Sequence, residues 1–514
     1  MKRLALLSAS DKTGIIDLAK VLTTEFDFDI ISSGGTARTL TEAGIAVTKV
    51  SDYTGFPEIL GGRVKTLQPR IHGGILARTD NPSDQEDLAD NDIRPIDLVV
   101  VNLYPFEQTV ANPDTTLTEA IEKIDIGGPT LLRAAAKNHA YLTVLCDPAQ
   151  YEPYLSEMRT QQGGQPSLGF RADCARQVFW HTATYDQAIA TYLTAQADGT
   201  SSRYALSGTQ KQTLRYGENP HQPAVWYQTG SQPSGWAVAE KLQGKDLSYN
   251  NLVDLEAARR IIAEFPGENG PAAAVLKHTN PCGVAIGDSL AHTYKRAFAA
   301  DNVSAFGGIV ALNQEIDIET AEALTQTFLE CVVAPGCALK AREILAQKKN
   351  LRVLVLPDLL SGPSQTIRAI AGGFLTQTAD NVQENVSQWN FVSERQPDET
   401  ELDEMLFAWR VAKHVKSNAI VVSNERTTVG IGAGQMNRVG AVKIALEQAA
   451  EKAQGATLAS DGFFPFDDSV KTAAAAGIKA IVQPGGSIRD QDSITAANEL
   501  GVIMALTGTR HFLH

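Results

Sequence analysis

The chain has 514 residues, with 45 Lys and Arg against 59 Asp and Glu, so its formal net charge is −14, and 43% of its residues are hydrophobic. Single hydrophobic cores stop growing near about 250 to 300 residues, so this length predicts at least two domains. The acidic balance argues against a nucleic-acid partner, because general binding of that kind needs dense Lys and Arg. Small anions can still bind where a few cations and backbone amides converge.

The cysteine pattern and the apolar runs define the expected compartment. The five cysteines form neither a paired framework nor a CxxC element, so neither disulfides nor a structural zinc is predicted. The apolar run in residues 1–10 is too short for a secretory signal, and no stretch approaches the roughly 18 apolar residues of a membrane span. We therefore expect a soluble, cytoplasmic protein with no membrane partner.

The first part of the chain alternates short apolar runs with helix-like stretches. In chain order these are LALLS at 4–8, GIIDLAKVL at 14–22, FDIIS at 28–32, TARTLTEAG at 36–44, DLVVVNLY at 97–104, IDIGGPTLLRAAAKNH at 124–139 and YLTVLC at 141–146. This rhythm predicts an α/β fold with a parallel sheet and crossover helices. Ligands of such sheets bind outside the carboxyl ends of the strands, where helix N-termini point their amides.

A change of composition separates this region from the rest of the chain. Polar and Gly-rich stretches lie between 160 and 212, so we place a domain boundary near 200 and predict domains over 1–199 and 200–514. Further strands are predicted at AAAVLKH 272–278, SAFGGIVAL 304–312, AIVVSN 419–424, TVGIGAGQ 428–435, ATLAS 456–460, AIVQPGG 480–486 and GVIMALTG 501–508. Their number predicts two related α/β units, although no sequence repeat is evident.

The loops after the first two strands have the composition of a phosphate cradle. Ser10 and Lys12 follow the first strand, and Ser33, Gly35 and Thr36 follow the second. Glycines admit a close anion, while hydroxyls, amides and lysine bind its oxygens. For either loop alone, a tight turn that caps a helix is the simpler alternative. Neither loop is a Walker A or a dinucleotide fingerprint.

A basic segment follows at 61–74, GGRVKTLQPRIHGG. It places Arg63, Lys65, Arg70 and His72 within ten residues and is too rich in glycine to predict a regular helix. A solvated basic loop is the alternative to an anion site.

Two motifs of the second domain carry chemistry. LRYGENPHQ at 214–222 predicts a loop that presents Arg215 and Tyr216. In LKHTNPCG at 276–283 an apolar strand ends in Lys277 and His278, and at a frayed strand end both side chains can turn into a cleft. A satisfied core histidine is the alternative.

The PCG triplet of that motif invites comparison with zinc deaminases. Their signature is HxE followed by PCxxC, but Cys282 has no second cysteine behind it and no HxE before it. No metal site is predicted, even where the fold is deaminase-like.

The N-terminal motifs, with VNLYPF at 101–106 and EKIDIGGPTLLRAAAKNH at 122–139, closely resemble the inosine monophosphate (IMP) cyclohydrolase half of the bifunctional purine biosynthesis enzymes. That half resembles methylglyoxal synthase, a doubly wound parallel sheet. The resemblance implies that the ribonucleotide phosphate and base are held by Ser10, Lys12, Ser33, Gly35, Thr36, Arg63, Lys65 and Thr66. It implies that the site is completed by Asn102, Tyr104, Asp125, Gly127, Gly128 and Lys137.

Ring closure requires a carboxamide nitrogen to attack a formyl carbon of the same molecule, followed by loss of water. Orientation alone then supplies much of the acceleration. Asp125 could act on the carboxamide proton, and Lys65, Tyr104 and Lys137 could stabilise the oxyanion, although the sequence does not fix which does which.

LSYNN at 247–251, VVAPG at 332–336, VKSNAI at 415–420, SDGFFPF at 460–466 and the final TGTRHFLH, with the strands above, resemble the transformylase half of the same enzymes. That half resembles a pair of cytidine-deaminase-like α/β units without zinc. The resemblance implies that His278 is the general base for the 5-amino group of 5-aminoimidazole-4-carboxamide ribonucleotide (AICAR) and that Lys277 stabilises charge on the formyl oxygen of 10-formyltetrahydrofolate.

The remaining implied contacts divide between the two substrates. The nucleotide side is Arg215, Tyr216, Asn250, Asn280, Asn418, Arg438 and Arg510. The folate side is Phe306, Gly307, Phe463, Phe466, Asp468 and the QPGGS loop. Asp467 and Leu513 stand where the family often has Arg, which affects the detail of folate contact.

The resemblance implies a bifunctional enzyme of de novo purine biosynthesis that formylates AICAR to FAICAR and closes FAICAR to IMP. It also implies a homodimer whose transformylase sites use both chains. The alternative is a zinc nucleobase deaminase with an N-terminal phosphate-sensing regulatory module.

Overall fold

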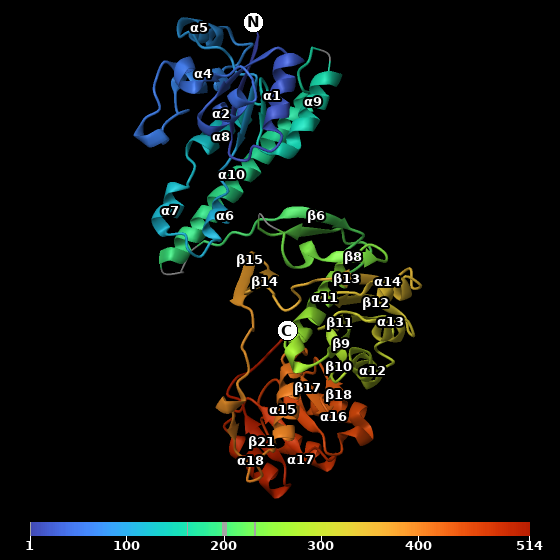
Figure 1. Ribbon diagram of the computed structural model, residues 1–514. Helices are drawn as coiled ribbons and strands as arrows, with labels where there is room; N and C mark the ends of the chain where they lie inside the picture. Colours follow the sequence, from blue (N-terminus) through green and yellow to red (C-terminus); the bar gives the residue numbers. More distant parts are fainter. Residues whose placement is uncertain (1, 162, 198–202, 231–232) are drawn as a thin grey trace. The chain divides into compact units, whose positions relative to one another are not determined.

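A computed structural model describes residues 2–161, 163–197, 203–230 and 233–514 (Figure 1). The chain divides into two compact units, Met1–Ser207 and Gly208–His514, and each is described by itself. The predicted boundary near 200 lies outside the described residues, so it stays a prediction. In the described ranges no helix is long and apolar enough to cross a membrane.

Unit 1 is built on a parallel five-stranded sheet of order β3-β2-β1-β4-β5. Its strands are β1 (Arg3–Ala9), β2 (Phe28–Ser32), β3 (Thr48–Lys49), β4 (Leu98–Asn102) and β5 (Thr143–Leu145). Successive side chains of a strand point to opposite faces, and in β1 Ala5 and Leu7 enter one core cluster while Leu4 and Leu6 enter the other. Both faces of the sheet are therefore buried.

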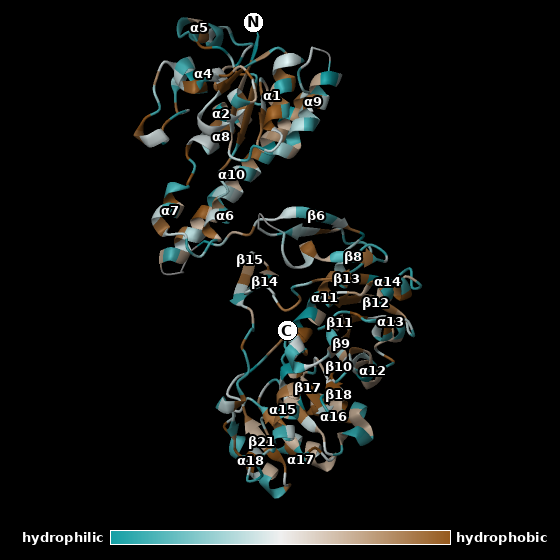
Figure 2. Cartoon of the chain, viewed as in Figure 1, coloured by the Kyte–Doolittle hydropathy of each residue, from teal (hydrophilic) through white to brown (hydrophobic). Residues whose placement is uncertain are grey.

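Helices cover the two faces of this sheet. Residues of α1 (Ile15–Thr24), α2 (Gly34–Glu42) and α9 (Tyr151–Thr160) pack on one face. Residues of α4 (Pro69–Leu76), α8 (Gly127–Lys137) and α10 (Leu168–Ala197) pack on the other, and the apolar residues gather in the central strands (Figure 2). The remaining elements of unit 1 are α3 (Val50–Thr54), η1 (Leu60–Gly62), α5 (Pro82–Asp90), α6 (Phe106–Val110), α7 (Leu117–Glu122) and η2 (Pro148–Gln150). The predicted doubly wound sheet is confirmed.

The basic segment 61–74 differs from the prediction in its second half, which is the helix α4. Pro69 occupies its first turn, where a missing amide hydrogen costs nothing. A Cβ at Gly74 would lie 2.5 Å from the Arg94 carbonyl oxygen, and one at Gly73 would lie 3.1 Å from Ile93. These glycines let the helix pack closely against a neighbouring segment, so their low helix propensity is outweighed by tertiary contacts.

Unit 2 contains a twelve-stranded mixed sheet of order β16-β21-β20-β19-β17-β18-β10-β9-β11-β12-β13-β8. One half holds β8 (Glu240–Gln243), β9 (Ala272–Lys277), β10 (Asn280–Ile286), β11 (Gly308–Leu312), β12 (Leu329–Ala334) and β13 (Arg352–Val355). The other holds β16 (Asn390–Phe391), β17 (Ile420–Asn424), β18 (Thr427–Gly432), β19 (Thr457–Ser460), β20 (Ala480–Gln483) and β21 (Ile503–Leu506). The halves join where β10 pairs antiparallel with β18 at Ala285 and Thr427.

The two halves repeat one order of elements. The first half has α11 (Tyr249–Ile262), α12 (Leu290–Ala300), α13 (Ile318–Leu324) and α14 (Leu339–Leu345). The second has α15 (Glu399–Ala412), α16 (Arg438–Ala449), α17 (Asp468–Ala475) and α18 (Asp490–Glu499). In each half the first helix packs on one face of the sheet, and the other three pack on the opposite face. The predicted pair of related α/β units is confirmed by this order.

Two small hairpins complete unit 2. They are β6 (Thr209–Leu214) with β7 (Ala224–Gln228), and β14 (Gln365–Ile370) with β15 (Gly373–Thr378). The short 3₁₀ turns are η3 (Gly235–Val238), η4 (Gly267–Asn269), η5 (Val386–Gln388) and η6 (Ala450–Ala453).

Candidate active sites

The first candidate site lies at the carboxyl edge of the unit 1 sheet, where α1, α2 and α8 begin. Thr36 Oγ1 accepts a 3.0 Å hydrogen bond from the Ala9 amide at the end of β1. Asn102, the last residue of β4, accepts from the Ser10 amide at 2.6 Å and from the Asp11 amide at 2.8 Å. The side chains of Thr36 and Asn102 therefore fix the loop after β1 beside the helix N-termini.

Two lysines converge on the first turn of α2, which Ser33 precedes as the N-cap. A Cβ placed on Gly35 would lie 3.7 Å from Lys12 Nζ, and one on Gly34 would lie 3.4 Å from Lys65 Nζ. The helix N-terminus, its free amides and two ammonium groups together make a site for a small anion. The Glu58 carboxylate lies 3.5 Å from Lys65 Nζ.

The start of α8 borders the same site. A Cβ on Gly127 would lie 3.1 Å from Thr66 Oγ1, so the two loops are in contact. The Asp125 carboxylate accepts a 2.8 Å hydrogen bond from the Gly128 amide, and the Asp125 amide donates to the Tyr185 hydroxyl at 2.8 Å. Burial raises the pKa of Asp125, although the hydrogen bonds from the Gly128 and Gly127 amides oppose the rise. Such a carboxyl group is a candidate for proton transfer.

Three predicted residues of unit 1 are not joined to this group by any described contact. Arg63 lies 3.5 Å from Glu122, and the Tyr104 side chain is exposed. Lys137 ends α8, about 15 Å along the helix axis from Gly127 at 1.5 Å per residue. Their roles stay predictions.

The second candidate site centres on the hairpin turn between β9 and β10. Lys277 pairs with Asn280 across the strands, and His278 and Thr279 form the two-residue connection. Both have positive φ, 50° and 64°, as the type I′ turn of tight hairpins requires. The strand end is therefore a closed turn, not a frayed end, and it presents His278 exposed to solvent.

Lys277 is held against the predicted folate side. Its Nζ donates to the Phe306 carbonyl oxygen at 2.8 Å. A Cβ on Gly307 would lie 3.2 Å from Lys277 Nζ. Gly307 has φ +70° and Phe306 is exposed, its ring 5.4 Å from the Phe328 ring, centroid to centroid. An ammonium group and an aromatic face thus lie together beside the turn.

Hydrogen bonds link the turn to two further predicted segments. Asn280 Oδ1 accepts from the Lys416 amide at 3.2 Å, two residues before Asn418. On the other side, Asn250 Nδ2 donates to the Glu218 carbonyl oxygen at 3.2 Å, which ties α11 to the loop carrying Arg215 and Tyr216. The Arg215 guanidinium lies over the Tyr216 ring.

Arg438 and Arg510 differ in their surroundings. Arg438 is buried and bonded to Asp461, which is fully buried and also binds Ser417 and the Ala419 amide. Its charge is therefore neutralised inside the unit. Arg510 is exposed, with its guanidinium 4.3 Å from the centroid of the Phe512 ring.

The predicted folate loops lie near one another in the second half of unit 2. Phe463 and Phe466 are exposed, and the Arg489 guanidinium beyond the QPGGS loop lies 5.0 Å from the Phe466 ring centroid. Asp468 begins α17, and its carboxylate accepts from the Ser469 amide at 2.7 Å.

Sequence reasoning gave no role to four polar residues with long-range contacts in these units, namely Tyr185, Asp254, Asp461 and His511. Asp461 and His511 lie in the SDGFFPF and TGTRHFLH motifs, but each of the four contacts a partner far away in the chain, which a local motif does not identify. The one available signal was position, because Asp254 lies four residues after Asn250 on the same helix, where the side chains share a face.

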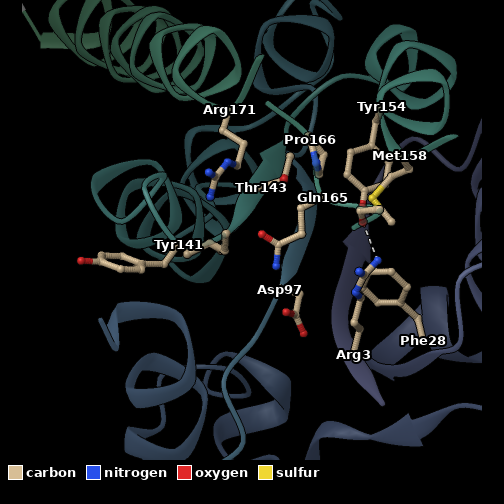
Figure 3. Close-up of a pocket in the computed structure, with 12 residues that line it drawn as sticks. Arg3, Phe28, Asp97, Tyr141, Thr143, Tyr154, Met158, Gln165, Pro166 and Arg171 are labelled. Carbon is tan, nitrogen blue, oxygen red and sulfur yellow. Dashed lines mark hydrogen bonds between the residues drawn. The ribbon is translucent and has the colours of Figure 1, made fainter. Parts of the chain in front are cut away.

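A small pocket of unit 1 lies elsewhere (Figure 3). Arg3 and Phe28 begin β1 and β2, and Asp97 and Leu142 immediately precede β4 and β5, so the pocket is at the amino ends of the strands. Its volume is about 20 Å³. Since ligands of such sheets bind at the opposite edge, this pocket is not the candidate site.

Cys282 behaves as a core residue. It is 6% exposed, and burial raises the pKa of its thiol to about 12. Among the described residues, no group of three or more His, Cys, Asp or Glu side chains is arranged to hold a metal ion.

Two α/β units, one with Lys12 and Lys65 at the start of α2 and the other with Lys277 beside His278, have the features of an enzyme with two sites for small anionic substrates. A family model described as "AICARFT/IMPCHase bienzyme" matches residues 135–448, and an "MGS-like domain" model matches residues 14–130. The chain therefore belongs to the family of bifunctional AICAR transformylase and IMP cyclohydrolase enzymes.

Curated relatives match over the full length. The chain is 70% identical to "Bifunctional purine biosynthesis protein PurH" of Nostoc punctiforme and 66% identical to proteins of the same name from Synechococcus elongatus and Synechocystis, with 100% of each chain covered. A solved chain, "Crystal structure of ForH", is 36% identical over 38% of this chain with a TM-score of 0.34, so the assignment rests on the curated relatives. The alternative of a zinc deaminase finds no support among these matches. The chain is a bifunctional enzyme of purine biosynthesis, an AICAR formyltransferase and IMP cyclohydrolase.

Proposed function

We propose that residues 1–199 close FAICAR to IMP and that residues 200–514 formylate AICAR. The observation that best supports this division is the pairing of Lys277 and His278 on one tight turn of unit 2, while Lys12 and Lys65 flank a helix N-terminus in unit 1. The first arrangement suits proton transfer beside a developing oxyanion, and the second suits a phosphate.

For ring closure, the phosphate binds at the start of α2 between Lys12 and Lys65. The amides and hydroxyls around Ser10, Ser33 and Thr36 donate to its oxygens. Asp125 accepts the carboxamide proton, because burial favours its protonated form and so makes it a stronger base than a solvated carboxylate. Lys65, Tyr104 and Lys137 are the predicted donors to the oxyanion.

For formyl transfer, the 5-amino nitrogen of AICAR attacks the formyl carbon of the donor. The bond between that carbon and N10 of the donor then breaks, and tetrahydrofolate leaves with a proton on N10. His278 accepts the amine proton, and Lys277 stabilises the negative charge that develops on the formyl oxygen. Lys277 already donates to the Phe306 carbonyl oxygen, so its ammonium group is oriented towards the predicted folate side before substrate binds. Arg215, Tyr216, Asn250, Asn280, Asn418, Arg438 and Arg510 are the proposed nucleotide contacts.

The donor proposed is 10-formyltetrahydrofolate. Exposed aromatic faces at Phe306, Phe463 and Phe466 support it, because such faces stack on a pterin. We further propose that the protein works in the cytoplasm as a homodimer.

Paired variants test the division. Lys277→Ala and His278→Ala should lower formyl transfer by about 10²- to 10⁴-fold and leave FAICAR cyclisation at the parent rate. Asp125→Ala should do the reverse. Both rates are measured by absorbance on the full-length protein. Equal loss of both activities in any of these three variants, if it is folded, would contradict the two-site assignment. If residues 1–199 were a phosphate-sensing module and not a cyclohydrolase, the parent protein would not convert FAICAR to IMP.

A further inference from the structure

A carboxylate lies beneath the turn that carries Lys277 and His278. Asp254, the sixth residue of α11, accepts a 2.8 Å hydrogen bond from the Thr279 amide. Burial raises the pKa of Asp254, against the opposing effects of this hydrogen bond and of the nearby His278 and Lys277 side chains. The helix itself is fixed by a capping box between Ser248 and Asn251 and by buried residues such as Leu255. Asp254 is therefore presented from a rigid element.

The turn requires such a partner because Thr279 is unsuited to its backbone conformation. His278 and Thr279 both have positive φ, which is least favourable for a β-branched residue such as Thr. Strained backbone of this kind persists only where the surroundings determine it, and it gathers at functional sites. Here the Thr279 amide donates its hydrogen bond to the Asp254 carboxylate.

The second half of unit 2 repeats the arrangement with different turn residues. Glu404, the sixth residue of α15, accepts a 2.6 Å hydrogen bond from the Arg426 amide. Glu425 and Arg426 both have φ 52° and connect β17 to β18. The same carboxylate-to-amide contact thus supports two related turns, of which one alone carries the Lys-His pair.

We propose that Asp254 is a positioning residue for formyl transfer: by accepting the Thr279 amide hydrogen, it holds the β9–β10 turn in the conformation that presents His278 and Lys277 together. This proposal rests on the proposed role of that pair. Asp254 acts on the backbone, so it affects the geometry of His278 and not the affinity for either substrate.

The test compares Asp254→Ala, Asp254→Asn and Glu404→Ala in the full-length protein. The alanine at 254 removes the acceptor, and asparagine keeps an acceptor oxygen without the charge. Glu404→Ala removes the corresponding contact in the repeat that lacks the Lys-His pair, and serves as the matched control. FAICAR cyclisation and the thermal midpoint are measured beside formyl transfer, so that loss of folded protein is detected.

Asp254→Ala should lower kcat for formyl transfer by about 10- to 100-fold, with KM for AICAR and for the formyl donor within about threefold of the parent. Asp254→Asn should restore most of kcat with an unchanged pH profile, and Glu404→Ala should stay within about twofold of the parent. The proposal is overturned if Asp254→Ala keeps kcat within twofold, if Asp254→Asn is as slow as alanine, or if Glu404→Ala loses as much. A parent protein that does not formylate AICAR would instead contradict the proposed function.

Discussion

At the scale of single residues, His511 shows most clearly how charge is organised inside unit 2. It is 2% exposed, its Nδ1 lies 2.6 Å from an Asp380 oxygen and its Nε2 lies 2.7 Å from a Glu384 oxygen. A neutral imidazole has a single N–H, so binding both carboxylates requires the imidazolium. Burial lowers the pKa of His511, but the hydrogen bonds and charges of Asp380 and Glu384 outweigh it and raise the pKa to about 9.

This pKa predicts how stability depends on pH. The folded-state pKa is raised above the ordinary value of 6.5, so the stabilisation is fully present below about pH 6.5 and is lost as pH rises through about 9. Its size is on the order of 3 kcal/mol at most. The Tm of His511→Gln should therefore lie below that of the parent at pH 6.5, and the difference should shrink towards zero near pH 10. A Tm difference that is constant from pH 6 to pH 10 would show that the imidazolium contributes nothing.

At the scale of elements, α4 shows how tertiary contacts decide a local structure. The segment is helical despite Gly73 and Gly74, since the space beside them is filled by the chain around Arg94. Gly74→Ala would force a Cβ to 2.5 Å from the Arg94 carbonyl oxygen, so the helix must shift.

We expect Gly74→Ala to destabilise unit 1 by about 1–3 kcal/mol, as overpacking does. Gly169→Ala is the matched control, because it lies in α10 with only Ser167 Oγ at 4.0 Å. There, at an exposed position in the first turn of α10, the same substitution should change the stability by no more than about 0.5 kcal/mol. Urea unfolding followed by circular dichroism measures both, and equal effects at the two positions would contradict the packing argument.

Local pattern predicted the fold of both units. The strands around Leu6, Val100, Val275 and Val421 were predicted because continuous apolar runs bounded by polar loops are typical of buried strands. The contacts of Asp254 and His511 were not predicted, since their partners at Thr279 and Glu384 are distant in the sequence and depend on how the elements pack. Motif residues such as Lys12, Lys65 and Thr66 were predicted, and the structure gathers them at one edge of the sheet.

At the scale of the whole molecule, two separate sites in one chain predict that the activities complement each other. Lys277→Ala should formylate AICAR about 10²- to 10⁴-fold more slowly but close FAICAR at the parent rate, and Asp125→Ala should accumulate FAICAR from AICAR. Mixing the two variants should restore conversion of AICAR to IMP, because FAICAR made by one protein can reach the other through solution. The measurement is IMP formed over time against each variant alone. A mixture as inactive as Lys277→Ala would mean that the two sites are not independent.

The acidic net charge of −14 is consistent with this arrangement. Anionic substrates need local cations, and the structure places Lys12 and Lys65 together at one site and Lys277 at the other. Carboxylates lie near these cations as well: Glu58 is 3.5 Å from Lys65 Nζ, and Asp254 accepts a hydrogen bond from the Thr279 amide, two residues after Lys277.

The most direct test of the two-site account is a spectrophotometric assay of the full-length protein with AICAR and 10-formyltetrahydrofolate. The account predicts that IMP forms with the parent, that FAICAR accumulates with Asp125→Ala, and that both products form about 10²- to 10⁴-fold more slowly with His278→Ala. Formation of IMP from AICAR by His278→Ala at the parent rate, or no product with the parent, would contradict it.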